Sequence, residues 1–213
     1  MYKAYTRQAS NFAFPEVNKN INGSSRPRPK MYNASLEDLK GKSYDEKVKA
    51  KADYRNAQLL FIKETKKFFE KLYAEDVKNN FTIQNEIDIC KKTYNGDVDA
   101  FFSQSKHKIK SKALLFMFES SCKMVKVCFL LEFTPSLAMF YSSYVKMEGL
   151  EIFAVYLEIF GYKEFKDTPE QRKRIADIKN SKNKTKYYTT YTQDVANDQR
   201  EFRRKTFNLP ENK

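Results

Sequence analysis

The chain has 213 residues, with 40 Lys and Arg against 27 Asp and Glu, a formal net charge of +13 and a mean hydropathy of −0.74. This length suits one domain of ordinary size, with some sequence to spare, and makes a second core hard to build. With only 5 Gly and 6 Pro, the composition favours helices over a turn-rich β-sandwich. We therefore predict an all-α fold, a helical bundle of about five to seven helices with extended basic N- and C-terminal arms.

The positive charge is concentrated at the two ends of the chain. Residues 1–42 hold 8 basic and 3 acidic residues, residues 43–161 hold 18 and 16, and residues 162–213 hold 14 and 8, which gives net charges of +5, +2 and +6. A nearly neutral body with basic ends suits an acidic partner, such as nucleic acid, an anionic membrane or an acidic protein surface.

Residues 1–42 show no periodic apolar face, and the alternating Arg and Pro residues at 26–29 favour an extended path. Aromatic residues are nevertheless frequent in this segment. We predict an arm that becomes ordered against a partner, with a disordered tail as the alternative. The first fifteen residues contain no acid, which leaves a mitochondrial presequence open. The candidate partner-binding residues of this arm are Tyr5, Arg7, Phe12, Phe14, Arg26, Arg28 and Lys30.

A long helix is predicted to begin at Ser43, because Ser43 and Glu46 have the spacing of a capping box. Apolar positions then recur without Gly or Pro until the Asn pair at 79–80. Thr82 can cap a second helix and Asp97 a third. An EF-hand beginning at Asp97 is excluded, because its twelfth position is a lysine where an acid is required.

The most apolar stretch runs from residue 112 to residue 161. We predict one helix over Ser111–Phe133, buried rather than membrane-spanning, because charged residues interrupt it. Thr134-Pro135 is predicted to start the next helix, which Gly149 breaks or kinks before Leu150–Phe160. Helices with such wide apolar faces need cover from other helices, so this pair is predicted to lie in the middle of a core formed by residues 43–179.

Thr168-Pro169 is predicted to start a short helix that ends near Lys179, and a polar linker follows. The tail combines extended Tyr and Thr residues with a candidate short helix over Asp194–Lys205. Residues 180–213 are therefore interpreted as a linker and a basic C-terminal arm. The candidate partner-binding residues of this arm are Tyr187, Tyr188, Tyr191, Phe202, Arg203, Arg204 and Phe207.

The sequence shows no glycine-rich phosphate loop, no nucleophile elbow and no cluster of metal ligands. His107, the only histidine, lies among lysines, and the three cysteines lack metal-ligand spacing; their odd number favours a reducing compartment. We therefore predict a protein that is not an enzyme, with no catalytic residue, metal or cofactor. A neutral helical body with basic, aromatic arms favours a structural subunit of a large assembly.

Residues 113–119, followed by Lys126-Val127-Cys128, resemble a helix of the helical-bundle microtubule inner proteins of cilia, the family of sperm acrosome-associated protein nine. The stretch from Tyr187 to Tyr191 is similar to the arms that such proteins thread between tubulins. The resemblance implies a cytoplasmic protein of the cilium axoneme. Its arms would bind the acidic luminal face of tubulin and neighbouring inner proteins.

Two alternatives stay open. One is a basic subunit of a mitochondrial ribosome, whose Lys and Arg residues would neutralise rRNA phosphates while tyrosines stack on bases. The tails, however, carry no recognised RNA-binding motif and interleave their basic residues with acids. The other is a peripheral subunit of a mitochondrial respiratory complex.

Overall fold

The computed structural model describes residues 11–165, 168 and 186–208. Within these residues the chain forms seven α-helices, two short 3-10 helices and one two-stranded sheet, which confirms the predicted all-α fold. In chain order the elements are η1 (Pro29–Tyr32), α2 (Tyr44–Lys78), α3 (Ile83–Thr93), α4 (Val98–Ser105), η2 (Lys106–Lys108), α5 (Lys112–Ser120), α6 (Cys122–Phe133), α7 (Leu150–Ile159), β1 (Lys163–Glu164), β2 (Tyr187–Tyr188) and α9 (Asn197–Phe207).

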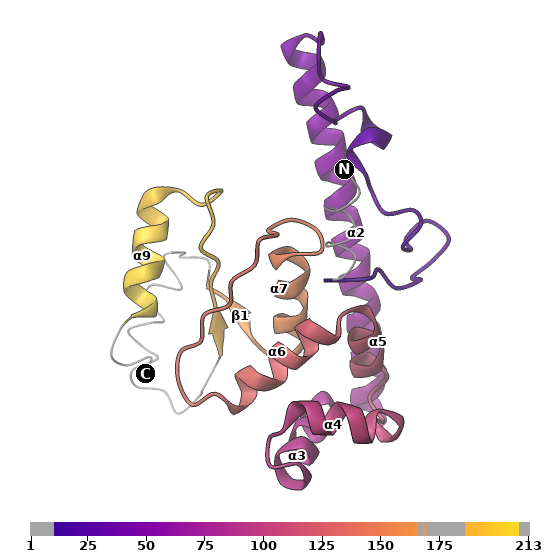
Figure 1. Ribbon diagram of the computed structural model, residues 1–213, viewed down its shortest axis with the longest axis vertical. Coiled ribbons are helices and arrows are strands. Elements are labelled where there is room, and N and C mark those ends of the chain that lie inside the picture. Colours follow the sequence, from indigo (N-terminus) through magenta and orange to yellow (C-terminus); the bar gives the residue numbers. More distant parts are fainter. Residues whose placement is uncertain (1–10, 166–167, 169–185, 209–213) are drawn as a thin grey trace.

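The long helix α2 is the axis of the molecule (Figure 1). Its 35 residues give a length of about 52 Å. The predicted capping box is confirmed, because the backbone N–H of Ser43 donates to the Glu46 carboxylate at 2.9 Å and the Ser43 hydroxyl accepts from the Glu46 N–H at 3.4 Å. Helices α5 and α7 pack against the C-terminal part of α2, while its N-terminal part projects beyond them.

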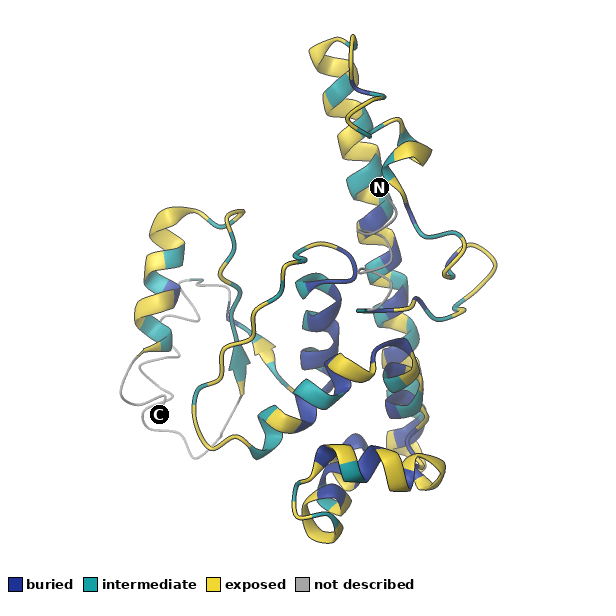
Figure 2. Ribbon diagram, viewed as in Figure 1, coloured by how far each residue is buried: buried dark blue, intermediate teal, exposed yellow. Residues whose placement is uncertain are grey.

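The core lies where α2 meets α5, α6 and α7, and Figure 2 shows the buried residues gathered there. Phe69 of α2, Phe129 of α6 and Tyr156 of α7 are all completely buried. The Tyr156 hydroxyl donates to the backbone carbonyl of Met117 at 2.7 Å, so the one polar atom of this ring is satisfied. Among the described residues, no helix is long and apolar enough to cross a membrane.

The single helix predicted over Ser111–Phe133 is wrong, because the chain leaves the helix at Ser121 between α5 and α6. The Ser121 hydroxyl accepts from the Met124 N–H at 3.3 Å, which caps α6. It also donates to the carbonyl of Asn11 at 2.5 Å, and the Ala13 N–H donates to the carbonyl of Ser120 at 2.8 Å. The break is therefore stabilised by a segment more than a hundred residues away, which apolar periodicity could not reveal.

The helix predicted to start at Thr134-Pro135 is also wrong, because residues 134–149 contain no helix. The Thr134 hydroxyl instead donates to the carbonyl of Leu130 at 2.7 Å and so closes α6. At Gly149 a side-chain Cβ would lie 2.0 Å from the carbonyl oxygen of Tyr144. Only glycine allows this close approach, so the chain makes a tight turn here before α7 begins.

Part of the predicted N-terminal arm belongs to the core. Phe12 is 2% exposed and Phe14 is 8% exposed, and the ring centres of Phe12 and Tyr156 are 6.2 Å apart. Ile21 is also buried. The core therefore includes residues that precede the predicted range 43–179.

The C-terminal segment joins the body through the parallel pair of β1 and β2, in which Lys163 lies opposite Tyr187. The predicted short helix over Asp194–Lys205 is confirmed as α9, with bounds shifted by two or three residues. The helix predicted to end at Lys179 and most of the linker after it lie outside the described residues.

Candidate nucleic-acid interface

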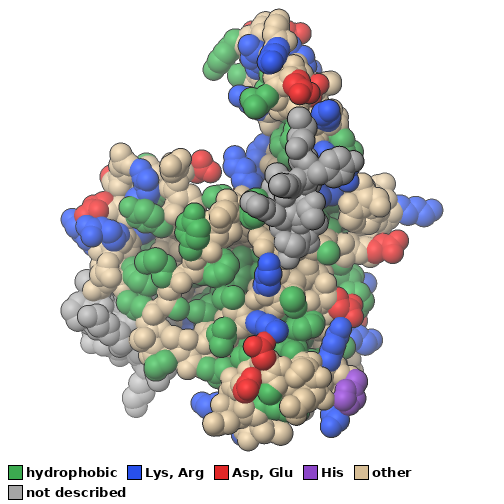
Figure 3. All heavy atoms as spheres, in the orientation of Figure 1, with side chains coloured by type: hydrophobic (Ala, Val, Ile, Leu, Met, Phe, Trp, Pro, Cys, Tyr) green, Lys and Arg blue, Asp and Glu red, His purple; other side chains and the backbone are tan. Residues whose placement is uncertain are grey.

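A basic loop runs from the end of α4 to the start of α5. Residues 106–112 contain four lysines, one histidine and no acidic residue, and these five side chains are all exposed. We call this segment the basic loop. Figure 3 shows the histidine beside Lys and Arg side chains at the lower end of the molecule. Closely spaced lysines create a positive potential that attracts phosphate groups.

Two buried carboxylates hold the C-terminal part of the basic loop in place. Asp76, in the last turn of α2, accepts from the Ser111 hydroxyl at 2.8 Å and from two backbone N–H groups at the start of α5 at 2.8 and 3.0 Å. Glu86 of α3 accepts from the backbone N–H of Lys110 at 2.8 Å. Negative charge is favourable at the N-terminus of a helix. The backbone of the loop is thereby fixed to α2 and α3, although its lysine side chains lie in solvent.

Aromatic rings lie beneath two of these lysines. The Lys110 amine lies 5.4 Å from the centre of the Phe81 ring, and the Lys106 amine lies 5.5 Å from the centre of the Phe118 ring. These distances are within the range of cation–π contacts. Phe81 is still 38% exposed, which is high for a large apolar side chain. A half-exposed ring beside lysines is the combination with which proteins bind single-stranded nucleic acid, since rings stack on bases and lysines attract phosphates.

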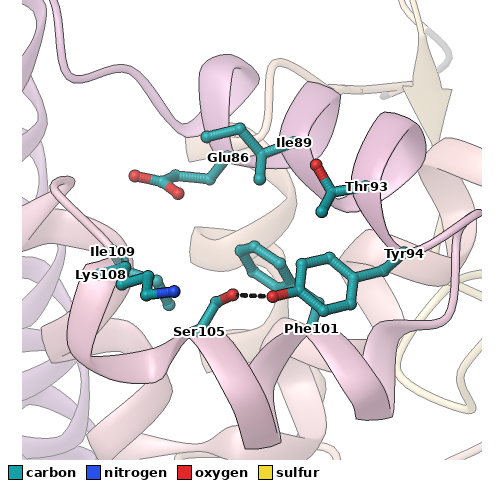
Figure 4. Close-up of a pocket in the computed structure, with 8 residues that line it drawn as sticks. All are labelled: Glu86, Ile89, Thr93, Tyr94, Phe101, Ser105, Lys108 and Ile109. Atoms are coloured by element: carbon teal, nitrogen blue, oxygen red, sulfur yellow. Dashed lines mark hydrogen bonds between the residues drawn. The ribbon is translucent and has the colours of Figure 1, made fainter.

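Two adjoining pockets lie along the basic loop. One has a volume of about 300 Å³ and is lined by residues that include Phe81 and Lys110. The other has a volume of about 210 Å³ and is shown in Figure 4, where Lys108 lies across the opening from Tyr94. The hydroxyls of Tyr94 and Ser105, which both line this second pocket, form a hydrogen bond with each other. Both pockets share Glu86, Ile89 and Lys108.

The two buried cysteines show no sign of nucleophilic chemistry. Burial raises the pKa of the Cys90 thiol to about 11, with a smaller contribution from the charge of Asp97. Burial also raises the pKa of the Cys128 thiol well above its ordinary value. Both thiols are therefore protonated at neutral pH and behave as small core residues.

The residues predicted as partner-binding in the N-terminal arm have divergent positions. Phe12 and Phe14 contact each other with ring centres 4.9 Å apart and are buried, and Arg26 forms an ion pair with the buried Glu148, with one N–O distance of 2.8 Å. These three side chains stabilise the fold of the chain itself. The others are either exposed or outside the described residues: Arg28 and Lys30 are exposed, and Tyr5 and Arg7 are not described.

The predicted residues of the C-terminal arm lie around β2 and α9. Tyr188 is half-buried and donates to the Glu158 carboxylate at 3.1 Å, and Arg203 is buried and donates to the carbonyl of Thr190 at 2.9 Å. The remaining members range from half-buried to exposed: Tyr187, Phe202 and Phe207 are half-buried, and Tyr191 and Arg204 are exposed. In Figure 1 the described parts of the two predicted arms lie on opposite sides of α7, so these parts do not form one surface.

Sequence reasoning did not identify the basic loop together with Phe81 as a site. The run of lysines was visible, and it was the only available signal. Phe81 precedes the loop by more than twenty residues, and only the folding back of α3 and α4 brings its ring beneath Lys110.

Comparison with curated proteins identifies a relative with an informative name. The chain is 33% identical over 206 residues to a protein of Acanthamoeba polyphaga mimivirus named "Putative ATP-dependent RNA helicase". The match covers 86% of this chain and 25% of the relative, so the chain spans about a quarter of the relative's length. No family model and no solved structure matches the chain.

This relative corrects the prediction of a non-enzymatic structural subunit that binds axonemal tubulin. Its name describes an ATP-dependent RNA helicase, which is an enzyme, so this relative contradicts the prediction of a protein that is not an enzyme. The sequence argument rested on missing catalytic motifs, and because the chain matches only about a quarter of the relative, their absence here says nothing about the rest of that relative. Nucleic acid as a partner, which was the weaker alternative, stays a prediction.

The sequence Gly41-Lys42-Ser43 has the letters that end a nucleotide-binding P-loop, but its setting differs from one. Leu36 stands where the first glycine of that motif is required, and no strand precedes the segment in the described residues. The N–H of Ser43, which a phosphate would need, donates to the Glu46 carboxylate at 2.9 Å. This turn is therefore a helix cap rather than a phosphate site.

Proposed function

We propose that this chain is the helical, RNA-contacting region of an ATP-dependent RNA helicase system. The observation that carries the proposal is the 33% identity to a protein named as such a helicase, over 86% of this chain. The basic loop, with Phe81 beside it, is the part of the described surface whose chemistry suits RNA best.

A region of this kind has a plain physical role. The motor of a helicase must hold one strand while it steps, and a second contact on the same polypeptide or assembly raises the effective concentration of RNA near the motor. Lysine contacts to phosphates are independent of base sequence, so they suit an enzyme that moves along its substrate. The net charge of +13 supports the same role, because it speeds encounter with RNA.

The proposal is tested with the full chain and a fluorescein-labelled single-stranded RNA, by fluorescence anisotropy at several KCl concentrations. We expect the logarithm of the association constant to fall linearly with the logarithm of the salt concentration, with a slope of about −0.7 for each phosphate neutralised. Replacement of Lys106, Lys108 and Lys110 by Gln should weaken binding and make this slope shallower.

A matched control removes the same charge elsewhere. Lys49, Lys51 and Lys63 are exposed lysines of α2, and their triple replacement by Gln should leave most of the affinity and the slope intact. An absence of RNA binding at low salt would overturn the proposed function. Equal losses in the two triple variants would show that net charge alone, and not the basic loop, attracts the RNA.

A further inference from the structure

We propose that the two adjoining pockets along the basic loop form a binding groove for single-stranded RNA, in which a base stacks on Phe81 and the neighbouring phosphates lie against Lys108 and Lys110. This inference rests on the proposed function. It goes further in three ways: it states that the RNA is single-stranded, that a base stacks on Phe81, and that Lys108 and Lys110 contact the phosphates.

The backbone of Phe81 is held in place by the ends of α2 and α3. Its backbone N–H donates to the carbonyl of Asp76 at 2.9 Å, and the next residue, Thr82, is the N-cap of α3. The preceding residue, Asn80, has a left-handed φ of 59°, which turns the chain sharply after α2. Because the backbone of Phe81 is already held between two helix ends, only the side chain loses freedom when a base stacks on its ring, and a smaller loss of freedom makes binding stronger.

The lysines are arranged for a chain of phosphates rather than for one anion. Lys110 lies over the Phe81 ring, and its backbone is held by Glu86. Lys108 lines both pockets. A phosphate that links a nucleotide in one pocket to a nucleotide in the other would therefore lie beside Lys108.

Glu86, the acidic residue in the groove, does not prevent phosphates from binding to the lysines. Glu86 lines both pockets, but the residue is only 4% exposed, and one of its carboxylate oxygens accepts from the backbone N–H groups of Lys110 and Ser111 at 2.8 and 3.4 Å. Its negative charge is thus stabilised by the N-terminal end of α5. Four lysines in the adjacent loop outweigh it.

The geometry favours an unpaired strand over a duplex. In double-stranded RNA the faces of the bases are covered by their neighbours, and proteins contact such duplexes through phosphates and 2′-hydroxyls over a long surface. The groove has one half-exposed ring and a short row of lysines, which suits a few unstacked nucleotides. Asn80 and Asn85 line the pocket next to Phe81 and add polar groups that can meet base edges.

The test uses the full chain and two probes, a fluorescein-labelled oligouridylate of about 12 nucleotides and a blunt RNA duplex of the same length. We expect the chain to bind the oligouridylate more tightly than the duplex. Phe81→Ala should weaken binding of the oligouridylate by about tenfold, because loss of one base stack lowers affinity by that order. The salt slope should not change, since no charge is removed. Lys108→Gln should instead make the slope shallower by about 0.7.

Two variants control for folding and for general loss of aromatic surface. Phe116 is 40% exposed, close to the exposure of Phe81, and lines neither pocket, so Phe116→Ala should leave RNA affinity unchanged. Phe81→Leu keeps apolar bulk but removes the flat ring and should lose part of the affinity. It also replaces Phe81→Ala as the test if circular dichroism shows that the alanine variant unfolds.

The outcomes separate this inference from the proposed function. If the wild-type chain binds RNA but Phe81→Ala and Phe81→Leu bind it as tightly, the stacking site is overturned while the proposed function stands. If the duplex binds as tightly as the oligouridylate, the assignment to a single strand is overturned. If the chain binds neither probe at low salt, both proposals are overturned.

Discussion

Two segments contain the same kinds of residues but differ in how they pack against the body. They are the N-terminal segment, residues 11–42, and the C-terminal segment, residues 186–208. The first inserts Phe12 and Phe14 into the core. The second forms α9, in which Arg203 is the one buried residue, and its Phe202 ring stacks on Phe165 with centres 6.2 Å apart. Aromatic residues among basic ones therefore do not predict whether a segment covers its own core or remains outside it.

The difference lies in what the rest of the chain offers to each segment. The N-terminal segment meets the break between α5 and α6, where Ser120 and Ser121 exchange backbone and side-chain hydrogen bonds with it. It also meets a buried carboxylate, Glu148, which pairs with Arg26. The C-terminal segment also contacts the body, through Tyr188 and Glu158 and through the β1–β2 pair, but the guanidinium of Arg203 in α9 bonds to Thr190 of its own segment. An arm becomes part of the core when the core has unsatisfied groups that the arm completes.

The largest expected difference comes from removing one aromatic ring from each segment. Phe12→Ala should lower the free energy of unfolding by about 3–5 kcal/mol, because it leaves a cavity beside Tyr156. Phe202→Ala removes a half-exposed ring and should cost about 1 kcal/mol or less. Urea denaturation followed by circular dichroism measures both values. Equal losses would show that the two segments contribute alike to the core.

The next largest effect concerns the ion pair that anchors the N-terminal segment. Arg26→Met leaves the Glu148 carboxylate, whose side chain is 1% exposed, without its charged partner, and should cost about 3 kcal/mol. The double variant with Glu148→Met should recover most of this loss, since an apolar pair of similar volume replaces a buried ion pair well. Arg204→Met in α9 is the control, because Arg204 and its partner Glu201 are exposed. A double variant as unstable as the single one would contradict this account.

A smaller effect is expected in alkaline solution from Tyr188, the half-buried ring of the C-terminal segment whose hydroxyl donates to Glu158. Burial, together with the carboxylate of Glu158, raises the pKa of the Tyr188 hydroxyl well above its ordinary value. The folded state therefore retains this proton while the unfolded state loses it, so stability is full below about pH 10 and falls as the pH rises further. Tyr188→Phe should make that fall shallower in urea titrations at several pH values. Tyr191→Phe, at a ring that is 62% exposed, is the control.

Three helix starts could be predicted because the cap of each depends on residues within four positions. The caps at Ser43, Thr82 and Asp97 were all found in the sequence and confirmed. The break at Ser121, between the end of α5 and the start of α6, could not be predicted, because it depends on tertiary contacts such as that between Ser121 and Asn11. In the candidate site, too, the local sequence pattern was visible and the tertiary contacts were not.

Within that site, the lysines of the basic loop are visible as a run of letters. The ring of Phe81 and the two carboxylates that hold the loop come from other helices, so only the fold assembles them. Sequence reasoning placed function in the arms because their aromatic residues looked unpartnered. The structure shows that partners for Phe12, Phe14 and Arg26 lie within the chain.

The two segments can also be compared by measuring how fast the cysteines react with a thiol reagent such as DTNB. This comparison involves the smallest change in stability. Cys122 is exposed and should react in the folded protein, whereas Cys90 and Cys128 are buried with raised pKa values and should react only after unfolding. Cys128 is close enough to Tyr156 to affect the pKa of its hydroxyl, and Phe12 packs on the same ring.

Loss of the Phe12 ring should therefore admit the reagent to Cys128 through local opening, even under conditions in which Phe12→Ala is still folded. Phe202→Ala should leave Cys128 as protected as in the wild type, because α9 does not cover this part of the core. Mass spectrometry of the labelled peptides identifies which cysteine has reacted. If both variants expose Cys128 at the same rate, the protection of the core does not depend on the N-terminal segment, and the contrast between the two segments would be confined to equilibrium stability.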